Sequence, residues 1–124
     1  MLTGQCNCGA VTFTVAKTLR TSACHCTQCR KQSGHHWASG LAELADVDIK
    51  GDPKWFAASH LANRGFCGDC GSFLFWKAHR EPKISFSLGA INGETGLKID
   101  RHIFVADKGD YYDLADGVPQ FDPY

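Results

Sequence analysis

The sequence predicts a mainly β domain built from short antiparallel strands, and three observations support this fold class. Short apolar segments are separated by turn residues such as Gly, Asp-Pro, Asn-Gly and Lys-Gly-Asp. No segment keeps an apolar period of 3.6 residues over three turns, which a long amphipathic helix would show. The seven cysteines fall in three tight clusters, unlike the wide spacing of most disulfide frameworks.

The strand candidates follow one another along the chain. Val11 to Val15 alternates apolar and polar residues, as a half-buried strand does. Further strands are predicted at 36–41, 47–49, 54–57, 64–66, 72–76, 83–88 and 101–106. Helical turns are expected after Cys26, at 27–31, and near 90–94. The aromatic residues beside the third cysteine cluster are expected in the core, because buried aromatics dominate small β domains; they are Phe66, Phe73, Phe75 and Trp76.

The length and the net charge of the chain limit the classes of function that the protein can have. The 124 residues predict a single domain over 1–124. Lys plus Arg and Asp plus Glu both number 13, so the formal net charge is zero. This balance argues against a nucleic-acid partner, which requires a basic face. Neither a signal peptide nor a membrane span is expected, so we predict a cytoplasmic protein without a membrane partner, whose thiols stay reduced.

The cysteine spacing predicts metal binding. Neighbouring cysteines one or two residues apart are poorly placed to bridge each other, whereas metal ligands need that closeness. An odd total would also leave one thiol over after complete pairing. Thiolate clusters of this kind are typical of zinc sites. The three clusters are Cys6-x-Cys8, Cys24-x-Cys26-x-x-Cys29 and Cys67-x-x-Cys70.

Two partitions of the seven thiols compete. Spacing alone allows a zinc-ribbon pairing of Cys26 and Cys29 with the third cluster, which leaves three cysteines scattered. The alternative pairs the first and third clusters, each of which is followed by a glycine, and keeps the middle triplet together. We favour this second partition. A four-thiolate site is closed and structural, whereas three protein ligands leave one coordination position open, as in catalytic zinc sites.

The sequence contains three motifs around its cysteines: Cys6-x-Cys8-Gly9-Ala10-Val11, Cys24-His25-Cys26-x-x-Cys29-Arg30-Lys31-x-Ser33-Gly34 and Phe66-Cys67-x-x-Cys70-Gly71-Ser72. Together they resemble the glutathione-dependent formaldehyde-activating enzyme family, which includes the centromere protein V group. The tail segments His102-Ile103-Phe104-Val105 and 114–121 are similar to the family's C-terminal pattern, in which Tyr111-Tyr112 replaces a common tryptophan.

The resemblance implies a β-tent fold with zinc-bearing loops and two zinc ions per chain. It implies a structural zinc on Cys6, Cys8, Cys67 and Cys70 and a second zinc on Cys24, Cys26 and Cys29, where catalysis would occur. The implied activity is that of a carbon–sulfur lyase acting on a small thiol adduct, such as S-hydroxymethylglutathione formed from formaldehyde and glutathione.

Several residues near the middle cluster remain candidates for accessory roles. His25 is expected to point away from the metal, because it alternates with two ligands in an extended segment. Arg30 is a candidate partner for a glutathione carboxylate. The candidates for a fourth ligand of the second zinc are His35, His36, His60 and His102.

Two other functions compete with the enzyme. The chain is alternatively a non-catalytic zinc-binding interaction module, in which both metal sites are structural. A third reading is a cysteine redox sensor, in which Cys24, Cys26 and Cys29 form a reversible disulfide when the metal is lost.

Overall fold

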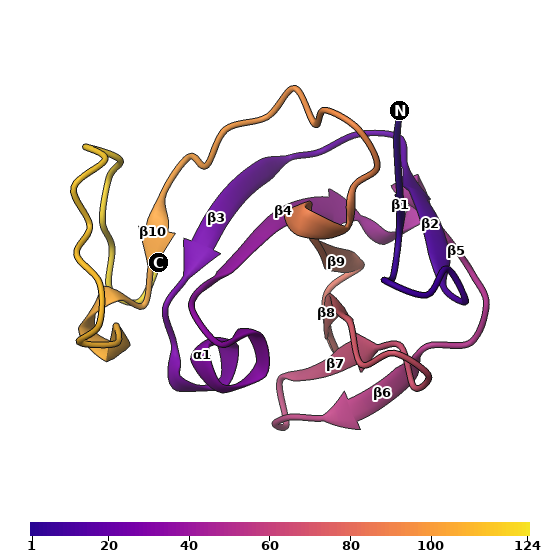
Figure 1. The fold of residues 1–124 in the computed structure, drawn as a ribbon, viewed down its shortest axis with the longest axis horizontal. Coiled ribbons are helices and arrows are strands. Elements are labelled where there is room, and N and C mark those ends of the chain that lie inside the picture. The colour runs from indigo at the N-terminus through magenta and orange to yellow at the C-terminus, as the bar shows by residue number, and fades with distance from the viewer.

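The computed structural model describes all residues from Met1 to Tyr124 and contains two sheets (Figure 1). The smaller sheet is antiparallel, with the order β1-β2-β5. The larger sheet has the order β10-β3-β4-β9-β8-β7-β6. The strands are β1 Leu2–Gln5, β2 Thr12–Val15, β3 Arg20–Cys24, β4 Trp37–Glu43, β5 Val47–Lys50, β6 Lys54–Ala57, β7 Ala62–Phe66, β8 Phe73–Ala78, β9 Lys83–Ser87 and β10 His102–Ile103.

Helical structure is limited to one short α-helix and three 3-10 turns. They are α1 Thr27–Ser33, η1 Leu44–Asp46, η2 Leu88–Ala90 and η3 Val105–Asp107. The mainly β prediction is therefore confirmed, and α1 begins where a helical turn was expected. The helical turn predicted near 90–94 lies slightly earlier, because η2 ends at Ala90. Ile91 is extended and forms an isolated bridge with Gly4, and the Asn92 amide donates to the Thr3 carbonyl at 2.8 Å, so this segment pairs with β1 instead.

Two strands lie outside the predicted set. β1 and β3 lack a clear apolar alternation, and β3 is built mostly from small or polar residues. Both strands form because they pair with neighbours, β1 with β2 and β3 with β4. β10 is shorter than the predicted 101–106 segment and pairs with β3 in parallel, the one parallel strand pair in a mainly antiparallel arrangement.

The core lies between the two sheets. Phe13 of β2 packs edge to face on Phe75 of β8, with ring centroids 5.0 Å apart, and lies 6.1 Å from Phe86 of β9. All three rings are almost completely buried. The prediction of core aromatics is thus confirmed for Phe75, whereas Phe66, Phe73 and Trp76 are only half-buried. No helix in the structure has the length and apolar character needed to cross a bilayer.

The C-terminal part of the chain returns to the edge of β3. After η2 it runs across the molecule as an irregular segment and enters β10 beside β3 (Figure 1). The last residues then fold back on β10, where the His102 amide donates to the Pro119 carbonyl at 2.8 Å and the Phe121 amide donates to the His102 carbonyl at 2.9 Å. Chain segments far apart in sequence therefore meet next to the middle cysteine cluster.

Candidate metal centres

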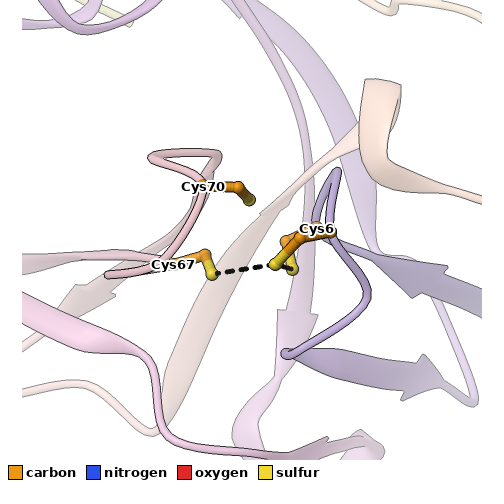
Figure 2. Close-up of side chains that lie close together, drawn as sticks. Cys6, Cys67 and Cys70 are labelled. Atoms are coloured by element: carbon orange, nitrogen blue, oxygen red, sulfur yellow. Dashed lines mark hydrogen bonds between the residues drawn. The ribbon is translucent and has the colours of Figure 1, made fainter.

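The first and third cysteine clusters meet at one site. Cys6 and Cys8 follow β1, and Cys67 and Cys70 lie in the turn between β7 and β8, where they face Cys6 (Figure 2). All four sulfur atoms lie within 4.8 Å of one another. The Cys8 sulfur is 3.7 Å from the Cys6 sulfur and 3.7 Å from the Cys67 sulfur. Tetrahedral Zn–S bonds of about 2.3 Å place sulfurs about 3.8 Å apart, so this four-thiol cluster fits a zinc ion.

Each loop of the four-thiol cluster ends in a glycine with positive φ. Gly9 has φ +83° and donates to the Cys6 carbonyl at 3.2 Å, and Gly71 has φ +80° and donates to the Cys67 carbonyl at 2.8 Å. These left-handed residues close the two turns, a conformation that glycine adopts without a steric penalty. The geometry of each turn therefore explains why a glycine follows Cys8 and Cys70.

Ser72 links the two loops of the four-thiol cluster. Its hydroxyl accepts from the Asn7 amide at 2.9 Å and donates to the Cys70 sulfur at 3.2 Å. The bond from Ser72 is the largest contribution that lowers the pKa of the Cys70 thiol, to about 5. Hydrogen bonds that favour the thiolate prepare a cysteine for metal binding.

The middle cluster forms a second site at the junction of β3 and α1. Cys24 is the last residue of β3, Cys26 is the N-cap of α1 and Cys29 lies within the helix. Their sulfurs lie within 4.8 Å of one another. As N-cap, the Cys26 sulfur accepts from the Cys29 amide at 3.4 Å, and hydrogen bonds from the Cys24 and Cys29 thiols lower the pKa of Cys26 to about 2. The same hydrogen bonding with Cys26 raises the pKa of Cys24. Three sulfurs this close together fit a thiophilic metal.

The structure groups no histidine with either set of thiols. Of the four candidates for a fourth ligand, His102 is fully engaged elsewhere, and His35, His36 and His60 stand outside both clusters. Arg30 directs its Nε to the carbonyl of Asp107 at 2.9 Å. The three thiols of Cys24, Cys26 and Cys29 are thus the whole donor set that the chain brings together there, and we call them the three-thiol cluster.

His25 belongs to a hydrogen-bonded chain on the opposite side of the β3 end. It is fully buried, its Nδ1 lies 2.5 Å from the Tyr112 hydroxyl, and its Nε2 lies 2.9 Å from His102 Nδ1. His102 Nε2 in turn lies 2.8 Å from the Asp116 carboxylate. Burial lowers the pKa of His25 to about 4 and raises the pKa of Tyr112, so the imidazole is neutral and the phenol keeps its proton.

With the Tyr112 hydroxyl as the first donor, the hydrogen bonds of this series run in one consistent direction. The Asp116 carboxylate only accepts, so His102 carries its proton on Nε2 and accepts at Nδ1 from His25. His25 then accepts at Nδ1 from the Tyr112 hydroxyl. The hydrogen bond from His102 accordingly lowers the pKa of Asp116. This series of hydrogen bonds connects the C-terminal segment to His25, which lies between Cys24 and Cys26 in the sequence.

Arg64 is the residue near the three-thiol cluster that the sequence interpretation missed. It lies on β7, is 4% exposed, and directs Nη1 and Nη2 to the Cys29 sulfur at 3.5 and 3.6 Å. The only sequence signal was its place three residues before Cys67, which suggested nothing about the middle cluster. The contact arises because β7 packs beside α1 in the folded chain.

A cavity of about 600 Å³ opens beside the four-thiol cluster, where Cys6 lines it, and none of Cys24, Cys26 and Cys29 is part of its wall. Trp37 and Phe73, which line it, also pack against Cys24 and Cys29. Trp37 is held by a hydrogen bond from its Nε1 to the Ser87 hydroxyl at 2.6 Å, and that hydroxyl donates to the Phe73 carbonyl at 2.7 Å. The other polar side chains of the wall are amides and hydroxyls: Gln5, Asn7, Gln32, Ser33, Ser72 and Asn92.

Comparisons with known proteins agree with the motifs. The family model described as glutathione-dependent formaldehyde-activating enzyme matches residues 1–107. A Schizosaccharomyces pombe protein named as an uncharacterized lyase is 28% identical over 122 residues, which cover 95% of this chain and 88% of that protein. A crystal structure of a Rhodobacter sphaeroides protein superposes with a TM-score of 0.63 at 22% identity, covering 76% of this chain and 91% of that one. This structural similarity concerns the fold alone.

Proposed function

This chain belongs to the glutathione-dependent formaldehyde-activating enzyme family, and we propose that it is a zinc-dependent carbon–sulfur lyase-like enzyme of the cytoplasm. Its substrate would be an adduct of a small thiol, such as S-hydroxymethylglutathione. The observation that carries the proposal is the three-thiol cluster, which packs against Trp37 and Phe73, two residues that also line a cavity of about 600 Å³. The name of the Schizosaccharomyces pombe relative, a lyase, supports the reaction class.

We assign two zinc ions to one domain that spans residues 1–124. The four-thiol cluster would hold a structural ion, because four thiolates fill a tetrahedral site. The three-thiol cluster would hold the second ion and leave one position for substrate. A zinc ion bound there would keep a substrate thiol in its thiolate form.

The side chains of the protein would bind and orient the proposed thiol adduct. In the cleavage direction, the carbon–sulfur bond of a hydroxymethyl thioether breaks, the sulfur retains the electron pair, and the hydroxyl proton leaves to solvent as the carbonyl forms. Trp37 and Phe73 shield Cys24 and Cys29 from water. The amides and hydroxyls of the cavity match the peptide groups of a glutathione-like ligand.

Elemental analysis of the purified protein tests the metal assignment. We expect two zinc ions per chain. One zinc with three titratable thiols would instead favour the redox sensor, whose basis in the structure is the closeness of the three sulfurs.

A pair of matched variants separates enzyme from interaction module. Cys26→Ser is expected to lose the second metal ion and turnover while staying folded, since Cys26 is half-buried at a helix terminus. Cys67→Ser is expected to unfold the protein or destabilise it strongly, because Cys67 is buried against the core. Equal unfolding of both variants, measured by circular dichroism, would contradict the catalytic assignment.

The thiol substrate is tested by a titration. We expect glutathione to change the visible spectrum of protein whose second site carries Co²⁺, because a thiolate would enter the ligand sphere. The Cys26→Ser variant is the control that lacks this site. An unchanged wild-type spectrum at millimolar glutathione would rule out the thiol-binding role.

A further inference from the structure

Arg64 carries a buried positive charge that has no acidic partner. The side chain is 4% exposed, and the only close contact between a basic side chain and a carboxylate in the structure joins His102 to Asp116, so no carboxylate pairs with Arg64. An unpaired charge in the interior is strongly destabilising, so buried charges are normally paired. The protein must therefore hold a negative charge near Arg64 that is not a carboxylate.

The neutral groups around Arg64 fix its orientation but do not balance its charge. Nε donates to Gln28 Oε1 at 3.0 Å and Nη1 donates to Gln32 Oε1 at 3.3 Å. These two residues lie one turn apart on α1, so they hold the same face of the guanidinium. The Phe73 ring lies under the guanidinium, with its centroid 5.5 Å from Cζ.

The remaining contacts are with sulfur. Nη1 and Nη2 both reach the Cys29 sulfur, at 3.5 and 3.6 Å, and Nη2 lies 4.0 Å from the Cys26 sulfur. Thiolates of the three-thiol cluster are the only anions within reach of this charge. A zinc ion with three thiolates has one net negative charge, which a single arginine balances.

We propose that Arg64 is the counter-charge of the three-thiol cluster and that it makes this site prefer an anionic fourth ligand, a thiolate, over a neutral one. The inference rests on the proposed function, in which the cluster binds a metal ion with an open position. A fourth thiolate adds a second net negative charge, and the nearby guanidinium favours that step. A neutral ligand leaves the charge unchanged and gains nothing from Arg64.

The test compares two small ligands on protein loaded with Co²⁺ at the second site. The ligands are 2-mercaptoethanol, which binds as a thiolate, and imidazole, which binds neutral; both affinities come from visible titrations. For Arg64→Met we expect the thiol Kd to rise at least about tenfold, equivalent to about 1.4 kcal/mol, with imidazole affinity within about twofold of wild type. Arg64→Lys, which keeps the charge, should retain most of the thiol preference.

Arg80→Met is the matched control, because it removes a positive charge from an exposed turn between β8 and β9. It should leave both affinities unchanged. Equal thiol binding by wild type and Arg64→Met would overturn the inference, as would an Arg64→Lys variant as weak as Arg64→Met. A wild-type protein that does not respond to thiol at all would instead contradict the proposed function.

A measurement on the wild type covers the case in which Arg64→Met does not fold or does not retain the second metal ion. The guanidinium protons of Arg64 are buried and bonded, so they should exchange slowly enough to be seen by NMR. Thiol addition to zinc-loaded protein should shift these resonances, and imidazole should not. Equal shifts with both ligands, or no shift with either, would overturn the inference.

Discussion

At the scale of single residues, adjacent side chains in the segment around Cys24 have different roles. Cys24 and Cys26 contribute sulfurs to the three-thiol cluster, whereas His25 between them is buried and bonds to Tyr112 and His102. The alternation of side chains along an extended backbone produces this division. The sequence prediction that His25 points away from the thiols agrees with this geometry, and its partners come from the distant C-terminal segment.

Tyr112→Phe tests whether the series of hydrogen bonds from Tyr112 to Asp116 stabilises the protein. Removing the hydroxyl leaves the buried Nδ1 of His25 without a partner, so we expect a loss of about 1–3 kcal/mol in the free energy of unfolding. Urea denaturation measures the loss, and the zinc content should not change. Tyr111→Phe is the control, because Tyr111 is exposed and its effect should stay within about 0.5 kcal/mol. A Tyr112→Phe protein as stable as the control would contradict this role.

The lowered pKa of His36 predicts that the stability of the protein depends on pH. Burial, with smaller contributions from His35 and His102, lowers the pKa of His36 below its usual 6.5, and its buried Nδ1 has no hydrogen-bond partner. In the window between that lowered pKa and 6.5, the unfolded chain binds more protons than the folded one. Stability therefore falls as the pH falls through this window.

The His36→Phe variant isolates this contribution. It should lose part of the decrease in stability seen when the wild type is taken from pH 7 to pH 5, as measured by urea denaturation at each pH. At pH 7 its stability should equal or exceed that of the wild type, since an unsatisfied polar atom has been removed. A variant with the wild-type pH slope would contradict the prediction.

At the scale of elements, the pairing of β4 with β9 depends on a glycine opposite an aromatic ring. Gly40 lies directly opposite Phe86 in the register, and a Cβ at position 40 would lie 2.4 Å from Phe86 Cζ. Because Phe86 is fully buried, its ring has little room to move. The same arrangement recurs in the small sheet, where Gly4 lies opposite Phe13.

Gly40→Ala should therefore destabilise the protein by about 1–3 kcal/mol, as overpacking of a dense core does. Thermal unfolding measures the effect. Gly89→Ala is the matched control, because no heavy atom lies within 4 Å of a Cβ built there. If both variants melt together, the close contact between β4 and the Phe86 ring is not a constraint on this sheet.

At the scale of the whole molecule, the four-thiol cluster joins the two sheets. Its first two cysteines extend from β1 of the small sheet, and its last two lie between β7 and β8 of the large sheet. The Phe13–Phe75 contact bridges the same two sheets within the core. Metal at this cluster would therefore stabilise the docking of the small sheet, as structural zinc does in small domains.

Removal of metal by a strong chelator tests this role. The amides of β1 and β2 should lose protection from hydrogen exchange before those of β4 and β9, because the small sheet has fewer strands and loses its metal link. Mass spectrometry of exchanged peptides measures the order. Cys26→Ser, which affects only the three-thiol cluster, should keep β1 and β2 protected. Earlier loss of protection in β4 and β9 would contradict the prediction.

Local patterns predicted most of the strands but not their arrangement. β2, β5 and β6 follow from short apolar or β-branched segments between turn residues, and α1 follows Cys26 as expected. β3 was missed because its small and polar residues carry no alternation; it exists because β4 pairs along its length. The helical turn expected near 90–94 ends already at Ala90 for a similar reason, since Ile91 bridges Gly4 of β1.

The sequence by itself determined the fold class, the family and the local geometry of each cysteine cluster. One or two residues between thiols, with a positive-φ glycine after Cys8 and Cys70, define a turn that is independent of the rest of the chain. The sequence favoured the pairing of the first and third clusters, which the structure brings together, but the tertiary structure alone brought Arg64 to the sulfurs of Cys26 and Cys29 and His102 to His25. These contacts join residues more than 30 positions apart, and strand pairing and packing fix such contacts without leaving a local pattern in the sequence.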